Sequence, residues 1–132
     1  MMSIVPRAFT LILVVGTVAS CSSHSRPAAV SQAALSALSA IQRGDCATVE
    51  AQLNGDMRSR LSAQQMCTDF HSYLAVYGDV VSHGSPKVTT IGADEVVQVP
   101  LHLTRSDGEF RVTYDGSRRI AGLYFLKPGV PL

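Results

Sequence analysis

The fold is decided in the stretch LSAQQMCTDFHSYLAVYGDVVSH, residues 61–83, where a helical pattern of apolar residues gives way to an alternating one. Ser62 is a favourable helix N-cap, and Gln65, three residues later, can complete a capping box. Leu61 and Met66 flank this start at the spacing of a hydrophobic staple. The sequence therefore predicts a long helix that begins just after Ser62.

Gly78 ends this predicted helix. Apolar side chains recur along it at helical spacing and form one stripe: Met66, Phe70, Tyr73, Leu74 and Tyr77. A stripe of this kind is typical of a hydrophobic core rather than of a cofactor site. His71 lies off the stripe, so we expect its side chain to be exposed.

Two further helices are predicted upstream. Residues 33–43 have apolar positions at helical spacing, and Gly44 stops the pattern. Asp45 can cap a second helix, which covers residues 46–54 and ends at Asn54-Gly55. The apolar positions are Ala34, Leu35, Leu38 and Ile41 in the first helix and Cys46, Val49 and Leu53 in the second.

Downstream of Gly78 the pattern is that of β-strands. Residues 79–91 predict one long strand or two short ones, broken near Gly84-Ser85-Pro86. Pro100 lies within the next strand and requires an edge or a position that needs no backbone N–H. Asp107-Gly108 and Asp115-Gly116 predict hairpin turns. The predicted inward-facing residues are Val97, Val99, Leu101, Leu103, Phe110, Val112 and Tyr114.

The last strand, within residues 119–127, contains IAGLYFL and is apolar on both faces. We therefore expect this strand to be central or covered on both sides. Helices followed by antiparallel strands indicate the α+β class. We predict one domain over residues 33–132, in which two or three helices pack on a curved antiparallel sheet of about four strands. Such a sheet wrapped on a long helix forms a cone whose open end is available to a ligand.

The N-terminal segment predicts export. MMSIVPR carries one positive charge, and residues 8–19 are apolar or small but too few to span a bilayer, which takes about 20 residues. Val18-Ala19-Ser20-Cys21 resembles a bacterial lipobox, which implies cleavage before Cys21 and attachment of lipid to its sulfur. The alternatives are a buried N-terminal element, or ordinary secretion with a free Cys21.

Residues 22–32, SSHSRPAAVSQ, are serine-rich and lack an apolar period, which predicts a flexible tether between the anchor and the domain. We assign residues 1–20 to the signal peptide and residues 21–32 to the lipidated cysteine and its tether. His24 is isolated in this tether, which is more typical of a solvated side chain than of a metal ligand.

Once Cys21 is assigned to the lipid, Cys46 and Cys67 remain. Because an exported protein meets an oxidising compartment, we predict a disulfide between them. The alternative is a pair of buried free thiols that act as small apolar side chains. Their spacing, with no nearby histidine, argues against zinc.

The segment RGDCATVEAQLNGDMRSRLSAQQMCTDFHSYLAVYGDV resembles the helical half of a small bacterial domain of unknown function, which belongs to the nuclear-transport-factor-like (cystatin-like) cone folds and often precedes an α/β-hydrolase domain. The resemblance rests on Gly44-Asp45, Asp56-Met57, Ser62 and Gly78, and continues in GEFRVTYDGSRRIAGLYF, residues 108–125. The chain departs from the family by lacking tryptophan. The resemblance implies a fold and little chemistry, because no G-x-S-x-G motif is present.

Composition and motifs argue against several function classes. The chain has 132 residues, 46% of them apolar and 16% charged, with a net charge of +1. Without Arg7, which lies in the predicted signal, cations and anions are equal in number, so we expect no nucleic-acid binding. No phosphate loop and no metal-ligand spacing appears, so we assign no catalytic, cofactor-binding or metal-binding residue.

Weak catalytic candidates can still be named. An isomerase could use an interior carboxylate, Asp69 or Asp79, with Tyr73 or Tyr114. His83 and His102 lie in or beside strands, and we expect His102 to point to solvent. These residues belong to the enzyme alternative alone, since aspartates in this chain occur where caps and turns favour them.

Three function hypotheses follow. The first is a lipid-anchored, non-catalytic module on the outer face of a bacterial membrane, which binds an envelope protein through the cone mouth or an exposed sheet face. The second is a carrier of a small apolar ligand, and the third is an isomerase- or hydrolase-type enzyme. The outer sheet face, with Gln98, His102, Arg111 and Thr113, is polar, so a monomer and a homodimer are both compatible with the pattern.

Overall fold

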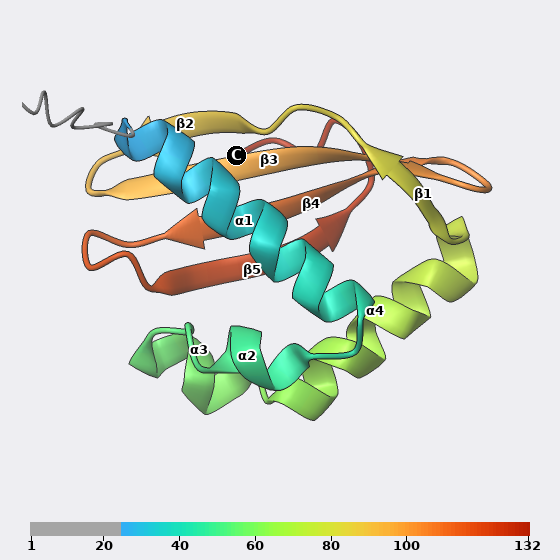
Figure 1. Cartoon of the computed structure of the whole chain (residues 1–132), viewed down its shortest axis with the longest axis horizontal. Coiled ribbons are helices and arrows are strands. Elements are labelled where there is room, and N and C mark those ends of the chain that lie inside the picture. Colours follow the sequence, from blue (N-terminus) through green and yellow to red (C-terminus); the bar gives the residue numbers. More distant parts are fainter. Residues whose placement is uncertain (1–24) are drawn as a thin grey trace, which may run out of the picture.

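A computed structural model describes residues 25–132, which form an antiparallel sheet with helices packed against it (Figure 1). Within these residues there are four helices and five strands, so the predicted α+β class is confirmed. In chain order the elements are α1 Arg26–Gln42, α2 Cys46–Glu50, α3 Gly55–Arg60, α4 Ala63–Tyr77, β1 Val80–His83, β2 Lys87–Ile91, β3 Asp94–Leu103, β4 Asp107–Tyr114 and β5 Ile120–Leu126. The prediction missed α3, a helix of six residues that is too short to show an apolar stripe.

The sheet has the order β1-β3-β4-β5, and β2 also pairs with β3. β1 and β2 lie end to end along one edge of β3, because β1 pairs with residues 101–103 and β2 with residues 94–98. Pro100 faces the break between them, where its carbonyl accepts a hydrogen bond from the Gly84 N–H at 2.8 Å. The missing N–H of Pro100 therefore interrupts no ladder, as the sequence required.

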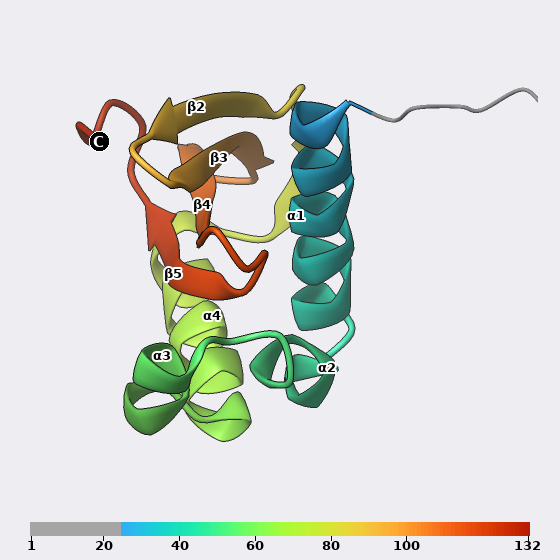
Figure 2. The same ribbon diagram turned by 90° about the vertical axis from the view of Figure 1, so that its left-hand side faces the viewer.

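One face of the sheet forms the core. Figure 2 shows α1 along this face, with α4 below β5 and the C-terminal tail on the opposite side of the sheet. The predicted inward-facing residues of β3 and β4 are all buried here. The side chains that fill the space between the helices and the sheet include Leu38, Ile41, Val97, Val99, Leu101, Phe110 and Val112, each at most 1% exposed.

Helix α1 begins at Arg26, so the predicted start at residue 33 is wrong and residues 26–32 of the predicted tether are helical. Arg26 donates through Nε to the carboxylate of Glu95 on β3, and Val30 is buried. Pro27 fits the first turn of a helix, where no backbone N–H is needed. The serine and proline of this segment are typical of a linker, but its alanines favour a helix, and the segment is helical.

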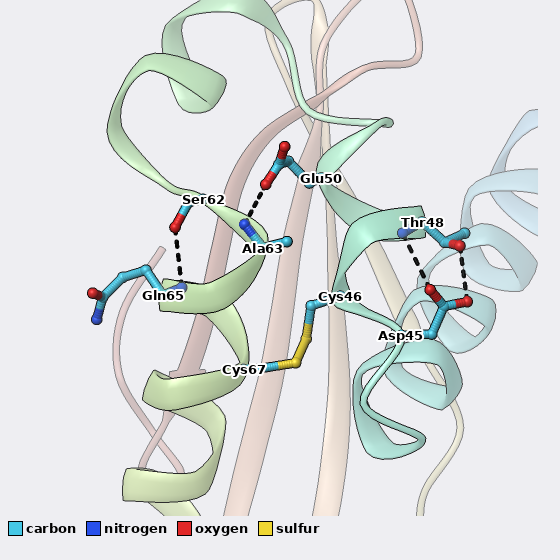
Figure 3. Close-up of a disulfide and its surroundings, with 8 residues drawn as sticks. All are labelled: Asp45, Cys46, Thr48, Glu50, Ser62, Ala63, Gln65 and Cys67. Atoms are coloured by element: carbon cyan, nitrogen blue, oxygen red, sulfur yellow. Dashed lines mark hydrogen bonds between the residues drawn. A yellow bond between two sulfur atoms is a disulfide. The ribbon is translucent and has the colours of Figure 1, made fainter.

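The disulfide between Cys46 and Cys67 joins α2 to α4, with a Cα–Cα distance of 6.0 Å (Figure 3). Asp45 caps α2 by accepting from the Thr48 N–H at 3.4 Å and its hydroxyl at 2.8 Å. The Glu50 carboxylate accepts from the Ala63 N–H in the first turn of α4. Covalent and polar contacts therefore fix the same helix–helix junction.

The predicted cap of α4 is confirmed in part. Ser62 Oγ accepts from the Gln65 N–H at 3.1 Å. The Gln65 side chain does not return to the cap and instead donates to Asp69 at 2.6 Å. His71 is exposed, as predicted.

Two predictions about the strands are wrong. The turn between β3 and β4 lies at residues 104–106, and Asp107-Gly108 begins β4. Gly108 is needed inside this strand because a Cβ would overlap the Tyr73 hydroxyl. β5 is an edge strand rather than a central one. The register shifts at its start, so Ile120, Leu123 and Phe125 all face the core, and this irregularity makes the sequence look apolar on both faces.

The outer face of the sheet is polar, but it is not wholly open to solvent. Arg111 is only 6% exposed, because its guanidinium group donates to the carbonyls of Val130 and Pro131 at 2.5 and 2.9 Å. The same group pairs with Glu109, which accepts from Gln98 at 3.0 Å. The tail from Val130 therefore covers part of a face that was expected to be exposed.

We predict that reduction of the disulfide lowers the free energy of unfolding by about 3 kcal/mol, because the bridge closes a loop between residues 21 apart in the chain. Urea denaturation with and without reductant measures the difference. The double variant Cys46→Ala, Cys67→Ala is the control, and its unfolding should not respond to reductant. Equal intact masses of the wild-type protein before and after reduction would contradict the bridge.

Candidate functional site

The free edge of β5 can be derived from the hydrogen-bond pattern of the sheet. The Pro100 carbonyl bonds to β1–β2, so Pro100 turns its backbone groups away from β4. Residues paired across antiparallel strands either both face each other or both turn away, so its partner Glu109 turns its backbone groups toward β5, where it pairs with Leu126. Leu126 therefore turns its backbone groups toward β4, and the directions alternate along β5 from there. On β5, Leu123 and Phe125 therefore direct their N–H and C=O groups to the open edge.

The start of the same edge is closed by another part of the chain. Ile120 accepts from the Asn54 N–H and donates to the Gln52 carbonyl, each at 2.9 Å, in a parallel bridge at Leu53. No described residue forms such a contact with the backbone edge of Leu123 or Phe125. Edge pairing by another segment, an isolated bridge at Leu53, therefore already occurs within this molecule and stops where the free edge begins.

A groove of about 430 Å³, here called the β5 groove, runs beside this free edge. Its walls come from the loop before α4, from α4 and from β5. The lining residues are Leu61, Met66, Asp69, Ser72, Tyr73, Leu123, Tyr124 and Phe125. Met66 and Tyr73 are buried, whereas Asp69, Ser72 and Tyr124 are exposed. The groove thus has an apolar floor and polar or amphipathic side chains at its rim.

Tyr73 anchors the α4 wall of the groove to the end of β5. Its hydroxyl donates to the Leu126 carbonyl at 2.8 Å. Its ring lies 5.4 Å from that of Phe125 and 4.8 Å from that of Tyr77, measured between centroids. Burial raises the pKa of Tyr73. The hydroxyl is therefore neutral at physiological pH and acts as a structural donor.

Of the candidates for an isomerase or hydrolase, Asp69 and Tyr73 both line the β5 groove, but the Asp69 carboxylate lies at its exposed rim and the Tyr73 hydroxyl is bonded to the Leu126 carbonyl. Asp69 and Asp79 are exposed, and Asp69 is bound by Gln65. Tyr114 is buried in the core, where burial raises its pKa to about 12. Neither carboxylate is the interior acid that the enzyme alternative required.

The histidines named in the sequence are likewise exposed. His102 Nδ1 lies 3.1 Å from the carboxylate of Asp107, and His83 Nδ1 lies 3.0 Å from the Gly84 carbonyl. His102 points to solvent, as predicted. Among residues 25–132 no three histidine, cysteine or carboxylate side chains are placed to hold a metal ion.

Glu95 is a buried carboxylate that sequence reasoning missed. It is 5% exposed, pairs with Arg26, and lies opposite Tyr114 in the sheet register. A signal was present, because the alternation of Val97 and Val99 extends back to position 95 and places it on the inward face. Its pairing with Arg26 makes it a support for α1.

The predicted lipidation site, Cys21, and His24 lie outside the described residues. Within residues 25–132, no helix combines the length and apolar character needed to cross a bilayer. The lipobox therefore stays a prediction from sequence.

We predict that Tyr114→Phe leaves the free energy of unfolding at pH 7 unchanged or raises it by about 1 kcal/mol, because the buried hydroxyl has no hydrogen-bond partner among the described residues. As the pH rises from 10 toward 12, the wild-type protein should lose stability. Unfolded tyrosine ionises at its ordinary pKa of 10.0, whereas burial raises the pKa of Tyr114 to about 12 in the folded protein.

Urea denaturation across this pH range measures the effect, and Tyr114→Phe should lose less stability than the wild type. Tyr124→Phe is the control, because the Tyr124 side chain is exposed and its replacement should leave the pH profile as it is. A Tyr114→Phe profile that falls as steeply as that of the wild type would contradict the assignment.

Comparisons with models of protein families, with curated proteins and with solved structures found no match to this chain. The resemblance to the cone-fold domain of unknown function therefore stays a prediction from the residues that carry it.

Proposed function

We propose that this protein is exported, anchored by lipid on Cys21 at the outer face of a bacterial membrane, and acts there as a non-catalytic binding module. Its partner is an envelope protein that supplies an extended peptide to β5. The observation that carries this proposal is the free backbone edge at Leu123 and Phe125 beside an apolar groove. The anchor is supported by the sequence of the lipobox.

A bound peptide would use the two parts of the site differently. Its backbone would pair with the N–H and C=O groups of Leu123 and Phe125, which gives affinity without regard to sequence. Its alternate side chains would point into the β5 groove, where Met66, Tyr73 and Phe125 favour apolar groups. The polar rim at Asp69 and Ser72 would remain in contact with water. Recognition would thus depend on the alternation of apolar residues in the peptide.

A second candidate function is the transport of a small apolar ligand. The groove volume of about 430 Å³ falls within the range of small-molecule pockets, and its floor is apolar. Native mass spectrometry of protein taken directly from its host separates the two candidates, because a carrier should retain a copurifying small molecule.

We predict that the wild-type protein incorporates radiolabelled palmitate and sediments with membranes, and that Cys21→Ser does neither, because a hydroxyl cannot replace the acceptor thiol. Ser22→Ala is the matched control and should be labelled like the wild type. The anchor proposal is wrong if the wild-type protein stays unlabelled and soluble.

We predict that Ser72→Trp weakens peptide binding by at least about tenfold, because the indole fills the β5 groove from an exposed position on α4. Peptides selected from a displayed library against the wild-type protein are the probes, and fluorescence anisotropy gives their affinities. Methylation of the peptide nitrogens that face β5 should weaken binding to a similar extent.

Ala75→Trp is the control, because Ala75 is exposed on the same helix but does not line the groove. This variant should bind the selected peptides like the wild type. Selected peptides that lack apolar alternation, or that bind Ser72→Trp with unchanged affinity, would exclude the β5 groove as the peptide site.

A further inference from the structure

We propose that one end of the domain rests on the membrane surface: the end formed by the start of α1, the β2–β3 turn and the β4–β5 turn. The partner is the lipid surface itself, at the level of the headgroups. This inference rests on the proposed lipid anchor at Cys21 and adds the face through which the anchored domain meets the membrane.

The connection between Cys21 and the first helix is short. Because α1 begins at Arg26, only Ser22, Ser23, His24 and Ser25 separate the lipidated cysteine from the helix. A fully extended chain spans at most about 3.6 Å per residue, so the Cα atoms of Cys21 and Arg26 can be no more than about 18 Å apart. The tether predicted from sequence over residues 22–32 would allow the domain to lie at least twice as far from Cys21.

The first turn of α1 is fixed to the domain by two contacts. Arg26 is paired with Glu95, whose side chain is buried, and Val30 packs into the core one turn later. Unwinding this turn to lengthen the connection would leave the Glu95 carboxylate buried without its cation, which is strongly unfavourable. The short connection therefore fixes which end of the domain lies next to the anchor.

The end of the domain next to the anchor brings the start of α1 together with the two turns. Arg26, Ala93 and Gly116 line one shallow depression, which shows that the start of α1 and the two turns are neighbours. Figure 1 shows the start of α1 and the two turns at the same end of the domain. Ile91, which closes β2 beside the turn, is 50% exposed. An apolar side chain in this position can insert at the headgroup boundary.

The charges at this end are balanced, but one cation is placed to meet a lipid phosphate. Arg118 is exposed in the β4–β5 turn, with a φ of 62°, and its flexible side chain can reach lipid phosphates. Two of the carboxylates are already engaged. Glu95 is bound by Arg26, and Asp115 accepts from the Ser117 and Arg119 N–H groups at 2.9 and 3.0 Å. Asp94, at the start of β3, is a third carboxylate at this end, so the attraction to an anionic surface depends on Arg118 and the insertion on Ile91.

This orientation leaves the β5 groove accessible. Helix α4 runs to the end of the domain beside β1, which lies opposite the end formed by the start of α1 and the two turns (Figure 1). β5 also leads away from the β4–β5 turn, so Leu123 and Phe125 come after the part of the strand next to that turn. A domain that rests on its α1 end thus presents the free edge of β5 to a partner rather than to lipid.

The test uses the absence of tryptophan from the chain, because a single introduced tryptophan then reports on one position. Full-length lipidated protein carrying Ile91→Trp is reconstituted into vesicles of phosphatidylcholine and phosphatidylglycerol with brominated acyl chains. We expect a blue-shifted emission that bromine quenches. Val76→Trp is the matched control, because Val76 is exposed on α4 away from this end, and its emission should be unaffected.

A second variant tests the cause. Insertion of a Gly-Ser segment of about ten residues between Ser22 and Ser23 should reduce the quenching of Ile91→Trp, because it releases the domain from the surface. The inference is overturned if the protein floats with the vesicles but Ile91→Trp is not quenched, or is quenched no more than Val76→Trp. Failure of the protein to float would instead refute the lipid anchor, and this inference with it.

Discussion

The packing of the Phe125 ring on β5 joins helix α4 to the sheet. Its ring centroid lies 4.9 Å from that of Phe70 on α4 and 5.1 Å from that of Phe110 on β4. The irregular start of β5 directs Phe125 to this position, and the disulfide holds α4 against α2 on the other side. Tyr73 adds a second contact between α4 and β5 through its hydrogen bond to the Leu126 carbonyl, and Phe125 and Tyr73 both line the β5 groove.

Much of the fold was predictable where local chemistry and tertiary structure agree. Ser62 caps α4 and Gly78 ends it, the alternating residues of β3 and β4 face the core, and Cys46 is bonded to Cys67. The errors have tertiary causes. Gly108 serves the close approach of Tyr73 rather than a turn, and the shifted register of β5 makes an edge strand look like a central one. Neither cause can be read from the neighbouring residues.

The candidate site was not predictable in the same way, because its decisive groups are backbone atoms. The open N–H and C=O groups of Leu123 and Phe125 belong to residues that would be apolar in any buried strand. A catalytic or metal site requires particular side chains at particular spacings, whereas a sheet edge requires only the absence of a neighbour. Sequence reasoning could exclude motifs, but only the strand order shows which edge is free.

The hydrogen bonds from Arg111 to the C-terminal tail affect how copies of this chain can associate. Two copies that met through the outer face of the sheet would encounter the carbonyl-bound segment at Val130 and Pro131 before they reached the strands. To bring the strands into contact there they would have to displace this segment, and the Arg111 guanidinium group would lose its two carbonyl acceptors and keep only Glu109. Self-association by that route therefore begins with a local unfolding step.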